Sequence, residues 1–485
     1  MGYIKGSARG QHLLFPSTID EYIDEANPVR AIGAFVGALD LAELGFVRGE
    51  PAETGRPGYD PRLLMGLFIW GHMNRVRSSR GLERECGRNL EAIWLVENLR
   101  PDFKTIADFR KDNGEPIKEV MVKFRLWCQA EELFGREVVA IDGSKFKAVN
   151  NSERNFTQKK LTKLIQRERT QVDGYLKAIA EADEQEVDEP QLSAEQLREK
   201  LKGIKEKLAG HEEMLQEMKA SEVSQVSLTD AEARLMKTSK GSEVSYNVQM
   251  VVDRKHKLIA ACEVTNEGND LGQLANMAQQ GKEALGVDKL TVLADGGYFD
   301  GDKIKECEEA GITTYLPPPK SNAAQRRGLF PAEQFIYDEA RDLFVCPQGE
   351  ELTFRTREKL HHKEYKIYRT NTCGACPLRA HCTTSQRGRK LRRWVHAAVL
   401  ERLKERIRGQ PELLKERKKL AEHPFGTIKR AMDQGYFLTK GIKKVTTEIS
   451  LTILSYNLKR VINILGVEKV VTSMTVNSSM KGATA

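Results

Sequence analysis

The chain has 485 residues, enough for roughly three domains of about 150 residues or for one large domain that carries insertions. Lys and Arg number 77 against 69 Asp and Glu, so the formal net charge is +8, a modest excess that becomes informative only where it is clustered. No apolar run is long enough to cross a bilayer, no secretory leader opens the chain, and eight cysteines in so long a chain do not suggest a secreted disulfide scaffold, so we expect a cytoplasmic protein without a membrane partner.

Residues 1–134 predict an all-helical domain. Apolar residues recur there at helical spacing, and Asp60 followed by Pro61 marks one helix start. Arginines gather in and around a short helix that begins near Ser78, namely Arg75, Arg77, Arg80, Arg84 and Arg88. These arginines either face DNA or form the solvated side of a helical bundle, since Glu83 and Glu85 interrupt the charge.

The helical spacing of apolar residues ends near residue 137, where a short apolar run predicts a buried strand that ends at Asp142 and Gly143. Heptad-spaced apolar residues within 155–225 then predict an antiparallel pair of helices that turns near Pro190. The seam of this pair is a packing feature, or the pair serves as an arm for dimerisation or for clamping DNA.

Strands then alternate with helices, which predicts an α/β sheet. A second buried run, Leu290–Ala294, again ends in an aspartate, Asp295. The other predicted elements are strands at Val244–Val252, Leu258–Val264 and Thr313–Leu316 and helices at Asp270–Leu285 and Gly301–Ala310.

From about Pro317 to Val395 the pattern becomes irregular, basic and rich in cysteine. Four thiols at metal-like spacing suit tetrahedral zinc, with free thiols as the alternative, and nearby histidines could replace one ligand. The thiols are Cys346, Cys373, Cys376 and Cys382, and the histidines are His361, His362 and His381. Trp394, among the basic residues, either belongs to a core or stacks on a displaced base.

Helical patterns return at Pro411–Met432 and Thr446–Leu465, and the small polar residues at the end predict a disordered tail over 466–485. The basic residues continue through Arg417, Lys418 and Lys419 up to Glu422. They form either a DNA-binding surface or a solvated helix face with alternating charge.

Two Asp-Gly pairs, at Asp142 and Asp295, each follow a predicted buried strand. A single Asp-Gly after a strand is more often a turn than a metal ligand. Two in one sheet could meet at the same sheet edge, where carboxylate oxygens suit Mg²⁺ and a later helix would supply a third carboxylate.

Several segments in order resemble the insertion-sequence transposases of the DDE superfamily, in the branch with a helical N-terminal domain and an inserted cysteine cluster. The segments are AIDGSKFKAVNN, TDAEARLMK, SYNVQMVVD, VLADGGYFD, CGACPLRAHC, EHPFGTIKR and LSYNLKR, preceded by SRGLERECGRN and PDFKTIADFRKDN. They extend over nearly the whole chain. Together they are far more specific than any one of them.

The resemblance implies a ribonuclease-H-like α/β core at 135–465, with a helical-hairpin insertion at 155–225 and a cysteine-rich insertion at 325–395. It makes Asp142, Asp295 and Glu422 the catalytic carboxylates, which hold two Mg²⁺ or Mn²⁺ ions. The implied activity is cleavage at the ends of an insertion sequence and strand transfer into target DNA, by a homodimer or larger assembly associated with the nucleoid.

The third carboxylate has a rival in Glu448, which also precedes an apolar helix. Glu422 is favoured because Lys429 follows it at the family spacing, where a lysine could contact the DNA backbone. The family places a tyrosine and an arginine where this chain has Lys415 and Lys418, and a lysine lacks the bidentate fork of an arginine. The predicted DNA-binding residues are Lys429, Lys418, Arg392, Arg393, Arg80 and Arg84.

Two other functions fit parts of the sequence. One is a regulator or inactive copy that binds DNA without catalysis, which the intact acidic triad disfavours. The other is a nuclease on the same core that cuts without joining strands, which the carboxylates alone do not exclude.

Overall fold

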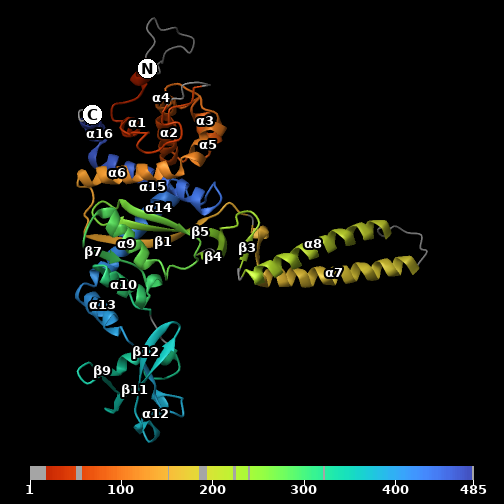
Figure 1. Cartoon of the computed structure of the whole chain (residues 1–485), viewed down its shortest axis with the longest axis vertical. Coiled ribbons are helices and arrows are strands. Elements are labelled where there is room, and N and C mark those ends of the chain that lie inside the picture. Colours follow the sequence, from red (N-terminus) through yellow and green to blue (C-terminus); the bar gives the residue numbers. More distant parts are fainter. Residues whose placement is uncertain are drawn as a thin grey trace, which may run out of the picture.

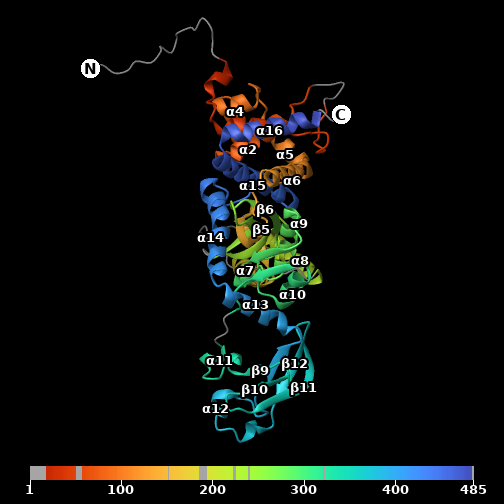
Figure 2. The same ribbon diagram turned by 90° about the vertical axis from the view of Figure 1, so that its left-hand side faces the viewer.

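The computed structural model describes residues 18–50, 57–150, 152–184, 194–221, 225–238, 241–319 and 323–482. The molecule is elongated (Figures 1 and 2), with helices from both ends of the chain at one end, a mixed sheet in the middle and a second sheet at the other end. A long helical pair projects sideways from the middle layer.

The N-terminal region is helical, as predicted. Short polar side chains start its helices: Asn27 accepts a hydrogen bond from the Val29 amide, and Asp60 accepts one from the Arg62 amide. The second helix is buried over nearly its whole length. The elements are η1 (Ile19–Tyr22), α1 (Pro28–Gly37), α2 (Pro61–Met73), α3 (Ser79–Glu85), α4 (Leu90–Leu95), α5 (Phe103–Asp112) and α6 (Gly114–Ala130).

Two C-terminal helices, α15 (Ile442–Leu465) and α16 (Val467–Gly482), pack against this region. The predicted disordered tail is therefore wrong up to residue 482, and residues 483–485 lie outside the described part. Apolar residues spaced three and four apart, Val467, Val470 and Met474, give α16 a buried face on α1 that the polar composition concealed. No helix in the described residues is long and apolar enough to span a membrane.

The central sheet has six strands in the order β4-β5-β1-β7-β8, with β6 also paired to β5. The pairs that β5 makes with β1, β4 and β6 are antiparallel, whereas β7 runs parallel to both β1 and β8. The strands are β1 (Val138–Lys147), β4 (Arg234–Thr238), β5 (Gly241–Asp253), β6 (Ile259–Thr265), β7 (Leu290–Leu293) and β8 (Ile312–Tyr315). The predicted α/β sheet is confirmed.

Helices cover both faces of this sheet. On one face, Val139 and Ile141 join the core formed with α9 (Leu274–Leu285) and α10 (Gly301–Glu309). On the other face, Ala140 packs against α14 (Glu412–Gly426), which follows α13 (Ala397–Gly409) and continues into a π-helical turn, η6 (Thr427–Ala431). Figure 2 shows α14 running along one side of the sheet. Side chains alternate along a strand, so residue 142 shares the face of Ala140.

The predicted helical pair is present as α7 (Gln158–Glu184) and α8 (Ala194–Ala220), while the predicted turn at Pro190 lies outside the described residues. A short turn η2 (Ser152–Arg154) and the paired strands β2 (Asn155–Thr157) and β3 (Gln225–Ser227) stand at the base. There Phe156, Leu161 and Met218 form a small core of their own. The pair is thereby anchored at one end only (Figure 1).

The stretch predicted to be irregular is instead a five-stranded antiparallel sheet, so this prediction is wrong. Its strands are β9 (Ile336–Asp338), β10 (Leu343–Val345), β11 (Glu351–Leu360), β12 (Lys363–Arg369) and β13 (Leu391–Trp394), joined by α11 (Ala323–Arg326), η4 (Ala332–Gln334), η5 (Thr372–Gly374) and α12 (Arg379–Cys382). A core of Phe335, Leu352, Tyr368 and Leu391 holds it together. Most residues of β11 are exposed and many are charged, which hides the alternation that marks a strand.

Candidate active site

Asp142 lies inside β1 and does not end it, which corrects the predicted strand boundary. Strand β1 continues to Lys147, and its residues on both sides of Asp142 are paired with residues of β5. The Asp142 side chain is 20% exposed and lies on the face of β1 that α14 covers. A carboxylate is therefore held by a rigid strand at the edge of the helix packing.

Asp295 comes two residues after Leu293, the last residue of β7. The parallel register pairs Ala140 with Leu293, so Asp142 and Asp295 each come two residues after the same rung. Asp295 Oδ1 accepts a hydrogen bond of 2.8 Å from the Gly297 amide, which starts the short turn η3 (Gly296–Tyr298). The sheet thus brings the two predicted aspartates to one place.

The electrostatics of Asp142 reflect this placement. Burial raises the pKa of the Asp142 carboxyl to about 6, and the charges of Asp295 and Asp270 raise it as well. Arg417 acts in the opposite direction, since its Nη1 lies 3.8 Å from Asp142 Oδ2. The site therefore concentrates negative charge, partly offset by one arginine from α14.

Glu422 is also on α14, but its side chain is 63% exposed and lies 3.8 Å from Lys418. Arg417 and Glu422 are five residues apart, which separates them by about 140° around a helix. Arg417 faces Asp142, so Glu422 lies on a different side of α14. Among the described residues no group of three His, Cys, Asp or Glu side chains is arranged to hold a metal ion, so the structure joins two of the three predicted carboxylates.

Glu448, the rival third carboxylate, is fully buried in α15. Its oxygens accept hydrogen bonds from the backbone amides of Leu438 and Thr439 at 3.0 Å and from the Thr439 hydroxyl at 2.8 Å. Arg77 Nη1 lies 3.6 Å away and is almost fully buried. The carboxylate is thus engaged in holding the loop before α15 and the N-terminal helices together.

Lys429 occupies the η6 turn, where its ammonium donates to the Ser144 hydroxyl at 2.6 Å and to the Lys145 carbonyl at 2.7 Å. It also lies 4.4 Å from the centre of the Phe146 ring. Burial lowers the pKa of Lys429 to about 8. The lysine predicted to reach DNA therefore anchors the helix to the half of β1 that follows Asp142.

Comparison with protein families supplies the context for this geometry. A family described as "Transposase DDE domain" matches residues 345–462, and one described as "Transposase domain (DUF772)" matches residues 17–112. These two matches indicate an insertion-sequence DDE transposase. No curated protein and no solved structure gave a significant match. The first match includes α14 and Glu422, and the second covers most of the N-terminal helices.

Two of the arginines predicted to bind DNA in this transposase, both on β13, already pair with acidic side chains of the protein. Arg392 Nε lies 2.9 Å from Glu358, and the Arg393 guanidinium binds Glu401 at 2.5 and 3.0 Å while stacking 3.8 Å from the Tyr337 ring centre. Arg393 is 11% exposed and Arg392 is 45% exposed. Of the two, Arg392 has the surface that a phosphate could reach.

The N-terminal arginines also include some that bind groups of the protein and some that are exposed. Arg75 and Arg77 donate to the carbonyls of Ala431 and Tyr436, so both join the N-terminal helices to the C-terminal part of the transposase. Arg84 is 65% exposed. Near it, Arg80 lies 4.9 Å from the Phe103 ring centre. Only the arginines of α3 and Arg88 can therefore still either contact DNA or form a solvated helix face.

The four cysteines proposed for zinc lie at one end of the second sheet. Burial raises the pKa of the Cys382 thiol, and the nearby thiols of Cys373, Cys346 and Cys376 raise it further. At Gly388 an added Cβ would lie 2.8 Å from the Cys373 Cβ, so the chain folds closely around this thiol. In the part of the chain that the structure describes, the thiols are not arranged as a metal site.

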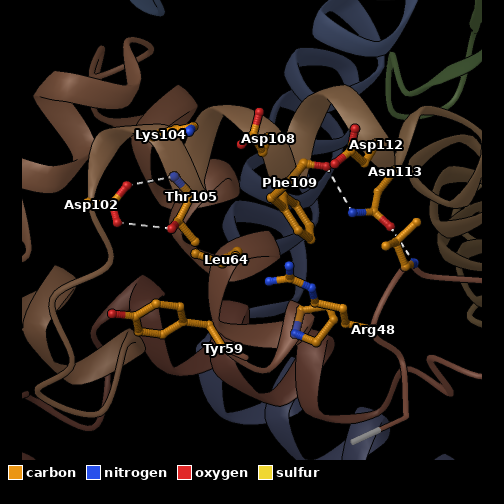
Figure 3. Close-up of a pocket in the computed structure, with 12 residues that line it drawn as sticks. Arg48, Tyr59, Leu64, Asp102, Lys104, Thr105, Asp108, Phe109, Asp112 and Asn113 are labelled. Atoms are coloured by element: carbon orange, nitrogen blue, oxygen red, sulfur yellow. Dashed lines mark hydrogen bonds between the residues drawn. The ribbon is translucent and has the colours of Figure 1, made fainter. Parts of the chain in front are cut away.

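A separate hollow of about 340 Å³ lies between the loop before α2 and helix α5 (Figure 3). Its polar walls already have partners: Asp102 accepts hydrogen bonds from the Thr105 amide and hydroxyl, and Asn113 accepts one from the Val47 amide. These contacts start α5 and tie a neighbouring loop to its end. They account for the hollow as a crevice between capped helices.

Proposed function

We propose that this transposase cuts DNA at the ends of an insertion sequence and transfers the freed 3′-hydroxyl to target DNA. The observation that carries the proposal is the pair Asp142 and Asp295, held at matching positions of neighbouring strands in a chain with two transposase-domain matches. Both carboxylates come from rigid elements, which is what precise positioning of a phosphodiester requires.

The proposed core is ribonuclease-H-like. Three antiparallel strands, β1, β5 and β6, stand beside two parallel strands, β7 and β8, with helices on both faces, and this arrangement supports the proposal. Residues 135–465 would form that core after a DNA-binding domain at 1–134. The helical pair at 155–225 and the second sheet within 325–395 would interrupt it as insertions.

Asp142 and Asp295 would hold two divalent ions, Mg²⁺ or Mn²⁺, with Glu422 as the third ligand. The fit rests on the donor set, since Arg417 compensates only part of the negative charge of the buried Asp142 beside Asp295, and hard cations prefer carboxylate oxygens. When bound, such ions activate the attacking oxygen and stabilise the leaving oxygen. Glu422 is well exposed, and its contact with Lys418 is a surface pair that is readily exchanged.

The other side chains would position DNA. Arg417 lies beside Asp142 and is 18% exposed, so it can offer two parallel donors to a phosphate next to that carboxylate. Lys418, Arg84 and Arg392 are the more exposed of the predicted cations, and we assign them to phosphate contacts. Lys429 would support β1, and Arg80 and Arg393 would contribute charge near the DNA path.

The cysteine cluster would bind one structural zinc ion, because four neighbouring thiols suit tetrahedral coordination. Measuring zinc in purified protein tests this point. Native protein is expected to hold one zinc per chain and Cys376→Ser to lose most of it, whereas Cys307→Ser, which changes a buried thiol of α10, is expected to keep it. Native protein without zinc would refute the assignment.

Cleavage and strand transfer of labelled element ends test the main proposal. With Mg²⁺, Asp142→Ala, Asp295→Ala and Glu422→Ala are each expected to abolish both products while DNA binding persists. An active Glu422→Ala variant would remove Glu422 from the ligand set. Cut but unjoined DNA would indicate a nuclease, and binding without cutting would indicate a regulator. The synapsis of two ends implies at least a dimer, which light scattering of the DNA complex would reveal.

A further inference from the structure

A chain of hydrogen-bonded polar side chains lies behind the two aspartates. Tyr298, three residues after Asp295, is fully buried and donates its hydroxyl proton to Gln249 Oε1 on β5. Gln249 is also fully buried, and its Nε2 donates to Asp270 Oδ1 at 2.7 Å. The loop that carries Asp295 is thereby tied to the loop that leads into α9.

Asp270 accepts hydrogen bonds from several of these side chains. Besides Gln249, it accepts hydrogen bonds from Asn247 Nδ2 at 2.7 Å and from Lys145 Nζ at 3.2 Å. Its side chain is 21% exposed, and that of Lys145 is 14% exposed. Three donors occupy this carboxylate, so it serves as an acceptor for the protein's own groups.

The hydrogen-bonded side chains pack directly against Gly143, the residue after Asp142. A Cβ added to Gly143 would lie 2.2 Å from Gln249 Nε2 and 2.7 Å from Asp270 Oδ1, which leaves no room for any side chain there. At the other end the Tyr298 amide donates to the Asp295 carbonyl at 3.3 Å. The network therefore touches the immediate surroundings of both aspartates, from the sheet face opposite to α14.

We infer that Tyr298, Gln249 and Asp270 are positioning residues that fix the spacing of Asp142 and Asp295. The inference rests on the proposed function, because the spacing matters only if both carboxylates share divalent ions. Hydrogen bonds are stronger in the low-dielectric interior of a protein than in water, and side chains that orient metal ligands commonly govern metal affinity. None of the three residues needs to touch the ions or DNA.

Two substitutions remove parts of the network while keeping side-chain shape, Tyr298→Phe and Asp270→Asn. A matched control exists in the same sheet: Tyr246 is fully buried on β5 and donates its hydroxyl to Asp230 at 2.8 Å. Tyr246→Phe therefore removes a buried tyrosine hydrogen bond outside the network, one that ends on a carboxylate where that of Tyr298 ends on an amide oxygen. Because Asp270 is partly exposed, its variant keeps the test open even if Tyr298→Phe does not fold.

The full-length variants would be titrated with Mn²⁺ by electron paramagnetic resonance, and their DNA cleavage measured against Mg²⁺ concentration. Tyr298→Phe and Asp270→Asn are expected to bind Mn²⁺ roughly tenfold more weakly than native protein, while Tyr246→Phe stays within about twofold. High Mn²⁺ is expected to restore cleavage, since Mg²⁺ demands stricter geometry.

The inference is overturned if both network variants match native protein in Mn²⁺ affinity, or if Asp270→Asn loses Mn²⁺ binding as completely as Asp142→Ala, which would make Asp270 a ligand. A different result marks failure of the proposed function. In that case native protein binds no Mn²⁺, or Asp142→Ala binds it as native protein does.

Discussion

At the scale of single residues, Asp142 shows a conflict between stability and chemistry. Its carboxyl is largely buried beside Asp295 and Asp270, and burial raises its pKa to about 6. A raised folded-state pKa means that the ionised carboxylate destabilises the fold at pH values above that pKa. Such strain is expected where charge is kept for a bound cation.

Replacing this carboxyl with an amide should therefore stabilise the metal-free protein. From the ordinary pKa of 3.8 to about 6, ionisation costs about 3 kcal/mol, so Asp142→Asn should gain up to that amount at pH 8. The gain should shrink as pH falls through 6 and vanish near pH 4, where the native carboxyl is protonated in both folded and unfolded chains. Urea unfolding at about pH 8 and about pH 4 measures this gain in stability. Glu422→Gln serves as a control that should not change stability.

Arg417 makes a second prediction at this scale. Its charge lowers the pKa of Asp142, so Arg417→Gln should raise that pKa and move the acid limb of the pH–rate profile for cleavage to higher pH. Lys418→Gln, which changes the adjacent exposed cation, should leave the limb in place. The midpoint of the limb, not the rate itself, decides the outcome, and equal midpoints in both variants would contradict the assignment.

At the scale of elements, helices α14 and α15 each carry a glutamate that the sequence offered as third carboxylate. The structure gives them different surroundings, because Glu422 faces solvent and Glu448 lies in the core beside Arg77. Both precede apolar helical residues, so this apolar pattern alone does not separate them. Burial does.

Glu448→Ala should accordingly lower stability by about 3–5 kcal/mol, since it leaves Arg77 buried without its partner. Glu422→Ala should change stability by less than about 0.5 kcal/mol, as for other exposed sites, while abolishing cleavage. Chemical unfolding and a cleavage assay on both variants check the contrast. A stable Glu448→Ala protein that lacks activity would reverse the two assignments.

Elements with a clear period were predicted well, and those without one were not. The strand around Leu290 and the helix around Leu274 follow from apolar runs of the right length. Most residues of β11 in the second sheet are exposed, so its alternation is weak, and the extension of β1 beyond Asp142 depends on pairing with β5. Pairing between distant segments leaves little trace in local sequence.

At the scale of the whole molecule, the two ends of the chain form one helical layer (Figure 1). Helix α15 packs on α2 and α6, and α16 packs on α1. The N-terminal helices are thus not separate from the core, because a single apolar cluster runs from α1 through the sheet to α16. The second sheet has its own smaller core.

Removing α16 should destabilise the N-terminal helices. A chain that ends after Gly466 loses Val467, Val470 and Met474 from the core and should be less stable by about 5–9 kcal/mol, at roughly 1.5–3 kcal/mol for each buried side chain. A chain that ends after Val476 keeps these side chains and should unfold like the native protein. Thermal unfolding distinguishes the two truncations, and equal melting temperatures would show that α16 contributes nothing.

The sequence by itself determined the helical N-terminal region, most strands of the central sheet and the transposase family, and it made Asp142 and Asp295 candidates, because hydrophobic periodicity and short motifs are local properties of the chain. Only the tertiary structure decided that Arg417 faces Asp142, that Glu448 and Lys429 bind the protein's own groups, and that Tyr298, Gln249 and Asp270 form a network behind the aspartates. The partners in these contacts are far apart in the sequence, by 275 positions for Asp142 and Arg417 and by 285 for Ser144 and Lys429, or belong to loops whose residues carry no periodic pattern. Such contacts arise from sheet register and helix rotation, which are fixed when the elements pack together.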